Sequence, residues 1–218
     1  EIILVVIGIL IALQINNWNE NRKILSKERV NLENIKRELT SSLRELKVDL
    51  KSNQGSLSST LDVYKYIQEK PILVDSMYFD FYEMVEFNYF FPQTSTYETL
   101  KSGNLEIIQS DSISKLITDI YESGFKRINR KVDTRRNAAR LLFPYYQKNF
   151  RTEIITREDN KKSLRGIPNN YNFVINDAEF ETLIVEALGG RLNVINDYKK
   201  TITNVENCIK AINSYLNE

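Results

Sequence analysis

Hydrophobic residues are most concentrated at the start of the chain. From Ile2 to Leu13 the sequence has eleven aliphatic residues and one glycine, with no charged side chain. A helix built from this run has no polar face, which is typical of a membrane-spanning segment. At about 1.5 Å per residue, however, it covers only about 18 Å of a hydrocarbon core of about 30 Å. Since the chain begins with Glu1 and not with Met, we expect further apolar residues upstream to complete the span.

Two other interpretations of this run stay open. A cleaved signal peptide would need small residues at its cleavage site, whereas Ala12 is followed by Leu13 and Gln14. A helix buried in a protein core would accommodate the same apolar residues. Trp18 favours the membrane, because tryptophan is enriched at membrane–water interfaces. Gly8 and Ala12 form a small-xxx-small pair, a pattern that allows a second transmembrane helix to contact this one.

After this run, apolar residues recur every three or four positions, as on one face of an α-helix. Two such stripes are long enough to define helices, one early and one at the end of the chain. The early stripe is Leu32, Ile35, Leu39, Leu43, Leu46 and Leu50, and the late stripe is Ile195, Tyr198, Ile202, Val205, Ile209, Ile212 and Leu216. We expect these two helices to pack lengthwise and antiparallel, self-association into a parallel coiled coil being the alternative.

The remaining chain predicts a few more helices and one long loop. Residues 75–90 and 111–142 have helical periodicity, while residues 151–176 contain the glycine, proline and paired asparagines of a loop. Helix ends are predicted at four residues, with Asp75, Asp111 and Asp177 as N-caps and Gly103 as a C-cap. The early helix should stop at Lys70-Pro71, although Ser52–Ser59, with Gly55, offers an earlier break.

Together these patterns predict an all-α fold. Seven glycines and four prolines in 218 residues leave few breaks, which favours a small number of long helices. Residues 1–17 are expected to be a transmembrane signal anchor, truncated at its N-terminus. This anchor would continue into an elongated antiparallel helical bundle of residues 18–218.

The composition excludes more functions than it suggests. The chain has no histidine, one cysteine and a formal net charge of +1. Without histidine, a Ser-His-Asp triad and the commonest zinc sites are impossible, and a single cysteine permits neither an internal disulfide nor a thiolate cluster. A near-neutral charge also lacks the basic excess of nucleic-acid-binding proteins. We therefore expect no enzyme, no cofactor, no metal and no nucleic-acid partner.

Charge and aromatic residues are distributed unevenly along the chain. Residues 71–100 carry five carboxylates and no Lys or Arg, while residues 126–140 carry seven Lys or Arg and one Asp. Eight aromatic residues lie between positions 78 and 91. One hypothesis is a site for a small anionic ligand formed by Arg135, Arg136, Tyr82 and Tyr89. The alternative is that the aromatic residues form a core stripe and that the charged segments neutralise each other or are solvated.

Two segments resemble a known family. Residues 1–20, EIILVVIGILIALQINNWNE, resemble the signal-anchor signature of a family of uncharacterised bacterial single-pass membrane proteins, and residues 97–108, YETLKSGNLEII, resemble its central motif. The resemblance implies a basic cytoplasmic N-terminus before Glu1, one span of the bacterial inner membrane and a helical domain in the periplasm. It implies no activity. The cations that follow the run, Arg22, Lys23, Lys27 and Arg29, would favour the cytoplasm by themselves.

The functional expectation is a membrane-anchored, non-enzymatic interaction or scaffold protein. Its partners would be the membrane and either another protein or a second copy, bound through the long helices. The alternative is a ligand-sensing periplasmic bundle that binds a small anion and signals through a partner protein.

Overall fold

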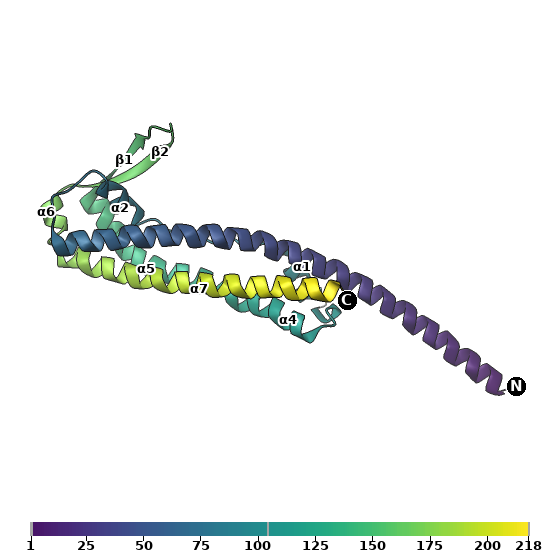
Figure 1. The fold of residues 1–218 in the computed structure, drawn as a ribbon. Coiled ribbons are helices and arrows are strands. Elements are labelled where there is room, and N and C mark those ends of the chain that lie inside the picture. Colours follow the sequence, from purple (N-terminus) through teal and green to yellow (C-terminus); the bar gives the residue numbers. More distant parts are fainter. Residues whose placement is uncertain (1, 104, 218) are drawn as a thin grey trace. The chain divides into compact units, whose positions relative to one another are not determined.

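The computed structural model describes the backbone of residues 2–103 and 105–217, and the side chains of these residues except for 131–141. This part of the chain is mostly helical, with a small two-stranded antiparallel sheet (Figure 1). The elements, in chain order, are α1 (Ile2–Glu69), α2 (Met77–Glu83), α3 (Ser95–Gly103), the 3-10 helix η1 (Leu105–Ile107), α4 (Asp111–Thr118), the π-helix η2 (Asp119–Phe125), α5 (Lys126–Asn149), β1 (Phe150–Thr156), β2 (Lys162–Pro168), α6 (Tyr171–Val174) and α7 (Ala178–Leu216).

The chain forms two compact units. The first unit consists of Glu1–Leu43, Pro92–Glu122 and Asn204–Glu218, and the second of Arg44–Phe91 and Ser123–Thr203. Helices α1 and α7 contribute to both units and run antiparallel in each. In the first unit the Tyr215 hydroxyl donates to Glu28, and in the second unit Gln68 donates to Glu181. The predicted antiparallel arrangement of the first and last helices is therefore present within each unit.

The buried face of α1 follows a strict pattern. From Glu28 to Ile67, the buried residues other than Glu38 alternate at spacings of four and three, which is the 3.5-residue period of coiled coils. The members of this seam are Glu28, Leu32, Ile35, Leu39, Ser42, Leu46, Asp49, Asn53, Ser56, Thr60, Val63 and Ile67. Leu43 and Leu50 of the predicted stripe are only half-buried, because Ser42 and Asp49 occupy the seam in their place.

Helix α1 continues without a break through Ser52–Ser59. The polar residues of this stretch satisfy themselves within the helix, since Asn53 Nδ2 donates to Asp49 O at 2.8 Å and Thr60 Oγ1 to Ser56 O at 2.6 Å. The earlier of the two predicted ends is therefore wrong. The helix stops at Glu69, where Lys70 has a positive φ of 49° and Pro71 follows.

The start of α1 stands apart from the core of the first unit. Residues 2–27 are exposed except for the half-buried Asn19. This end of α1 is long and apolar enough to cross a membrane, and none of its apolar window is buried inside the protein. The structure therefore contradicts one interpretation of the run, namely that it is a helix buried in this chain's own core.

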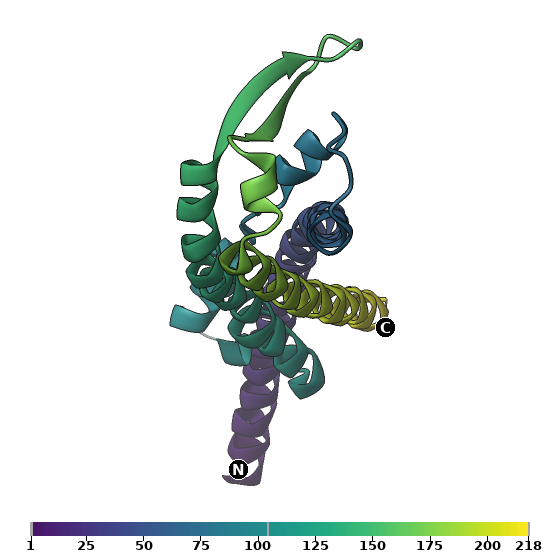
Figure 2. The ribbon, with the colours of Figure 1, turned by 90° about the vertical axis from the view of Figure 1, so that its left-hand side faces the viewer.

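The second unit contains the sheet, which packs on α2 and on the end of α5 (Figure 2). Strands β1 and β2 pair antiparallel with Thr152 opposite Gly166. A Cβ atom at Gly166 would lie 2.7 Å from Tyr146 Oη and 3.2 Å from the carbonyl carbon of Phe81, so only glycine allows this approach. Phe81, Tyr146 and Phe150 belong to the buried core below.

Residues 151–176 are not the predicted loop. They form most of β1, the whole of β2 and α6, so the description of the fold as all-α is only approximately right. β-branched residues fill β1, from Thr152 through Ile154 and Ile155 to Thr156, and Asn160 adopts a positive φ of 60° in the turn. The glycine and proline that predicted a loop, Gly166 and Pro168, lie in β2, and the turn itself contains no glycine.

The predicted helix over residues 75–90 is mostly wrong. Only Met77–Glu83 is helical, and its N-cap is Ser76 rather than Asp75. The side chain of Arg191 accounts for its end, because Nη2 donates to the carbonyl oxygens of Met84 at 2.7 Å and Glu86 at 3.0 Å. These carbonyls are thus satisfied outside a helix.

The other helix predictions agree better with the structure. Residues 111–142 are helical and continue to Asn149, interrupted by the π-helical turn η2. Ser110, not Asp111, is the N-cap of α4 and accepts from the amide of Ile113. Gly103 is the last residue of α3, and Asp177 caps α7 by accepting from the amide of Glu179 at 3.0 Å.

Candidate functional site

The strongest candidate is an exposed apolar surface in the second unit. We name it the apolar tip and define it by Ile72 and Val74, in the turn between α1 and α2, together with Phe173 on α6. Their side chains are 89%, 47% and 53% exposed, respectively. Exposed apolar residues on neighbouring segments are typical of surfaces that bind a partner.

Local structure forces these side chains outward. Exposure alternates along the turn after Pro71, where Leu73 packs on the core while Ile72 and Val74 face solvent. In α6, Val174 is fully buried and Tyr171 packs beside it, which leaves Phe173 on the outer side. The exposure therefore follows from inward-facing neighbours that the core requires.

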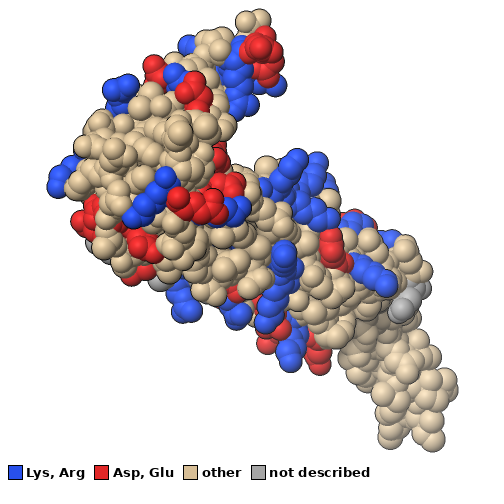
Figure 3. All heavy atoms as spheres, turned by 60° about the vertical axis from the view of Figure 1, so that its left-hand side comes forward, with Lys and Arg blue, Asp and Glu red and all other residues tan. Residues whose placement is uncertain are grey.

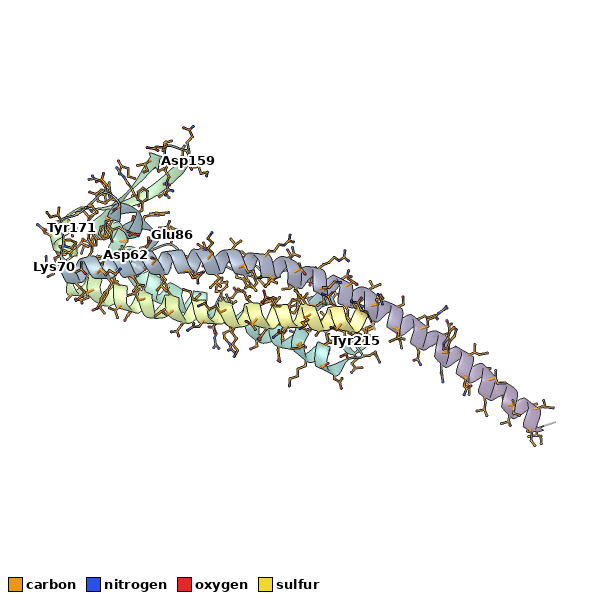
Figure 4. The ribbon with its side chains drawn as sticks, viewed as in Figure 1. Asp62, Lys70, Glu86, Asp159, Tyr171 and Tyr215 are labelled. Carbon is orange, nitrogen blue, oxygen red and sulfur yellow. The ribbon has the colours of Figure 1, made fainter. Side chains whose placement is uncertain are left out.

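Two hydrogen bonds hold the two segments of the tip together. Tyr171 Oη donates to Pro71 O at 2.6 Å, and Lys70 Nζ donates to Asn176 Oδ1 at 2.5 Å. Lys70 and Tyr171 both lie where α1 ends and α6 begins (Figure 4). Because these bonds fix the start of the turn and the buried Met77 fixes its end, the apolar tip is a preformed surface.

Acidic residues surround the apolar tip along the chain. Glu69 precedes the turn, Asp75 follows Val74, and Glu179 lies on the first turn of α7; all three are exposed. Lys70 is held by Asn176. Figure 3 shows a largely uncharged face on this unit with charged side chains at its border.

A second feature, in the first unit, holds the segment that begins at Pro92 against α1. The buried carboxylate of Glu38 accepts from Ser95 Oγ and Thr96 N at 2.7 Å each and from Tyr121 Oη at 3.2 Å. Gln93 N donates to Ser42 Oγ at 3.1 Å. Burial, and then the Glu38 charge, raise the pKa of Tyr121, so this hydroxyl stays a donor. The arrangement fixes α3 and carries no free nucleophile.

Glu28 holds the later part of the same segment, at Gln109, against α1. Its carboxylate accepts from Gln109 N at 2.7 Å and from Tyr215 Oη at 3.1 Å. An open groove of about 540 Å³ lies beside these residues, lined by Leu25, Ser26, Glu28, Arg29, Tyr215 and Leu216. Because the Glu28 carboxylate is already satisfied, we assign no ligand to this groove.

Of the described residues of the predicted anion site, Tyr82 lies beside an acidic side chain and Tyr89 lies among aromatic rings. Burial raises the pKa of Tyr82, and a hydrogen bond from its hydroxyl to Glu86 raises it further. Tyr89 contacts the rings of Phe87 and Phe91. The side chains of Arg135 and Arg136 lie outside the described residues. The anion site thus stays a prediction, and the Glu86 carboxylate beside Tyr82 disfavours a bound anion there.

The other candidate residues gain no ligand in the part of the chain that is described. Gly8 and Ala12 both lie on the exposed first turns of α1, and a Cβ at Gly8 would meet no atom within 4 Å. Cys208 is buried, and burial raises the pKa of its thiol to about 12, so it is not a thiolate at neutral pH. Among the described residues, no group of three Asp, Glu or Cys side chains is arranged to hold a metal ion.

Sequence reasoning missed the main features of both units. Glu28 falls on the apolar seam and Glu38 is buried beside it, and a periodicity count records both only as polar residues. Arg191 looks like any exposed helical arginine, although it is buried. A weak signal for the apolar tip exists, since Pro71 is followed by three aliphatic residues in a turn, where polar residues are usual.

Comparison with known proteins gives a family without a function. A family model described as a family of unknown function (DUF6090) matches residues 1–140. No curated protein matches the chain, and no solved structure matches it.

Proposed function

Since the chain belongs to the DUF6090 family, whose function is unknown, we propose a role from its surfaces: a membrane-anchored, non-enzymatic interaction protein that binds a partner protein at the apolar tip. The observation that carries this proposal is the exposure of Ile72, Val74 and Phe173 on a turn fixed by hydrogen bonds. A preformed apolar surface loses little conformational entropy on binding.

The anchor in this proposal is the apolar start of α1. Its exposed aliphatic residues favour lipid as their surroundings, and Trp18 at its end suits the membrane–water interface. The orientation is taken from the resemblance of residues 1–20 to bacterial signal anchors, which puts the helical units in the periplasm of a bacterial inner-membrane protein. A reporter fused after Glu218 tests this orientation. Activity of a reporter that works only in the cytoplasm would overturn it.

The partner in this proposal is a protein with an apolar pocket bordered by Lys or Arg. A photo-crosslinking amino acid placed at Ile72 in full-length protein, in native membranes, should capture one partner. The matched control is Val48, which is 68% exposed on the second-unit part of α1 and has no comparable apolar neighbour in the sequence. Equal capture from both positions would count against the tip as a specific surface.

Substitution then tests the chemistry of the surface. Ile72→Glu should abolish capture of that partner by a crosslinker at Val74, while Val48→Glu should leave it unchanged. Because Ile72 is almost fully exposed, neither variant should unfold the protein. Persistent capture in the Ile72→Glu variant would show that the apolar tip does not bind the partner.

A further inference from the structure

The part of α1 that follows the apolar run carries a group of cations. We name it the basic neck and define it by Arg22, Lys23, Lys27 and Arg29. All four are exposed, and at 100° per residue they cover about 160° of the helix surface. We infer that the basic neck binds the head groups of anionic phospholipids. This inference rests on the proposed anchoring of α1 in a membrane.

The carboxylates of the same stretch do not neutralise the basic neck. Glu28 is buried, and its oxygens accept from Gln109 and Tyr215. Glu20 pairs with Lys23 at 2.9 Å, but both side chains are more than half exposed, and such surface pairs are weak because water screens them. The surface of the neck is therefore positive. Lys23 can exchange its ion pair with Glu20 for one with a lipid phosphate.

Helix geometry directs these cations toward the bilayer. Arg22 lies seven residues after Ile15, about 10 Å along the helix, and the side chains of a helix point toward its N-terminus. The Arg22 guanidinium lies 5.3 Å from the centre of the Trp18 ring, so it reaches back over the interfacial tryptophan. This position matches the head-group layer, which extends several ångströms beyond the hydrocarbon core.

Lys27 and Arg29 lie farther along the helix, about 18 and 21 Å after Ile15. Because this is beyond the head-group layer by more than the Debye length of about 8 Å at physiological ionic strength, they contribute less to lipid binding than Arg22 and Lys23 do. Basic residues close to an anionic membrane each strengthen binding by about fivefold. The basic neck therefore selects anionic over zwitterionic lipid, chiefly through Arg22 and Lys23.

The single tryptophan of the chain supplies the probe. Full-length protein is placed in nanodiscs that contain either brominated phosphatidylglycerol or brominated phosphatidylcholine at equal mole fraction, and quenching of Trp18 fluorescence is measured. We expect severalfold stronger quenching by the anionic lipid at low salt. The difference should shrink at 1 M NaCl, where the Debye length is about 3 Å.

Two variants with equal loss of charge separate the neck from the net charge of the protein. In R22Q/K23Q/K27Q/R29Q the preference for phosphatidylglycerol should disappear. In R44Q/K51Q/K199Q/K200Q, which removes four exposed cations of the second unit, it should persist. Equal quenching by both lipids in the unsubstituted protein would overturn the lipid inference and leave the anchor intact. Absence of quenching by either lipid would instead overturn the anchor.

Discussion

Tyr121 donates its hydroxyl hydrogen to Glu38 Oε2 at 3.2 Å, and the other oxygen of this carboxylate accepts from Ser95 Oγ and Thr96 N. Replacing Glu38 with leucine removes the acceptor of three donors in a buried site. We expect the free energy that protects the Thr96 amide from exchange to fall by about 3 kcal/mol. Hydrogen exchange of full-length protein measures this change directly. The control is Glu33→Gln on the solvent side of α1, where Glu33 pairs with Lys36 and the protection of Thr96 should stay unchanged.

Arg191 should be essential to the segment that follows α2. Its guanidinium donates to the carbonyls of Met84 and Glu86, and the side chain is buried. Arg191→Met keeps the apolar stem but leaves these carbonyls unsatisfied, so we expect a loss of about 2–4 kcal/mol in the unfolding free energy of the second unit. Lys199→Met, on an exposed face of α7, should cost little. Similar denaturation midpoints for the two variants would show that Arg191 does not hold this segment.

Gly166 should tolerate no larger residue while Tyr146 keeps its hydroxyl. The Cβ of Gly166→Ala would lie 2.7 Å from Tyr146 Oη, which donates to or accepts from Thr152 at 3.0 Å. We expect Gly166→Ala to destabilise the second unit by about 1–3 kcal/mol. Tyr146→Phe removes the clashing oxygen, so in a double-mutant cycle the cost of Gly166→Ala should be smaller when Tyr146→Phe is already present. Additive costs, measured by thermal denaturation, would contradict this contact.

Asp49 should make the second unit more stable in mild acid. Burial, and then the neighbouring Glu45 charge, raise its pKa from the usual 3.8 to about 6. A carboxyl whose pKa is raised in the folded state contributes stability in its protonated form, and this contribution is lost as pH rises through about 6. Asp49→Asn should therefore raise the unfolding free energy at pH 7 by about 1–3 kcal/mol and flatten its change between pH 7 and pH 4.

The control for this pH dependence is Asp62→Asn. Asp62 lies on the same helix and pairs with Lys65 at the surface. Its replacement should leave the slope of stability against pH unchanged. Chemical denaturation at a series of pH values compares the two variants, and parallel curves for Asp49→Asn and the unsubstituted protein would contradict the raised pKa.

Periodicity predicted the parts of the fold that local sequence controls. Leu32, Ile35 and Leu39 are buried on α1 as their spacing requires, and Pro71 ends that helix because it has no amide hydrogen. The hairpin β1–β2 escaped prediction because its stability depends on contacts far along the chain, such as Gly166 against Tyr146 and Phe81. A local pattern contains no information on such partners.

The candidate site was even less visible in the sequence. Ile72 is exposed only because Leu73 and Tyr171 take the inward positions, and that outcome requires α6 to lie beside the turn. The buried polar residues of α1 are a similar case. Glu38 becomes a structural acceptor only when the segment 93–96 reaches α1, some 57 residues later along the chain.

The alternation of four and three along α1 has a consequence for how this protein can vary. Inserting one residue into the seam would rotate every later seam position by about 100°, turning Val63 and Ile67 away from the core. Inserting seven residues preserves the register. Relatives that differ in length within this helix should therefore differ by whole heptads, and a matching heptad should be gained or lost in α7, where the antiparallel partner residues lie.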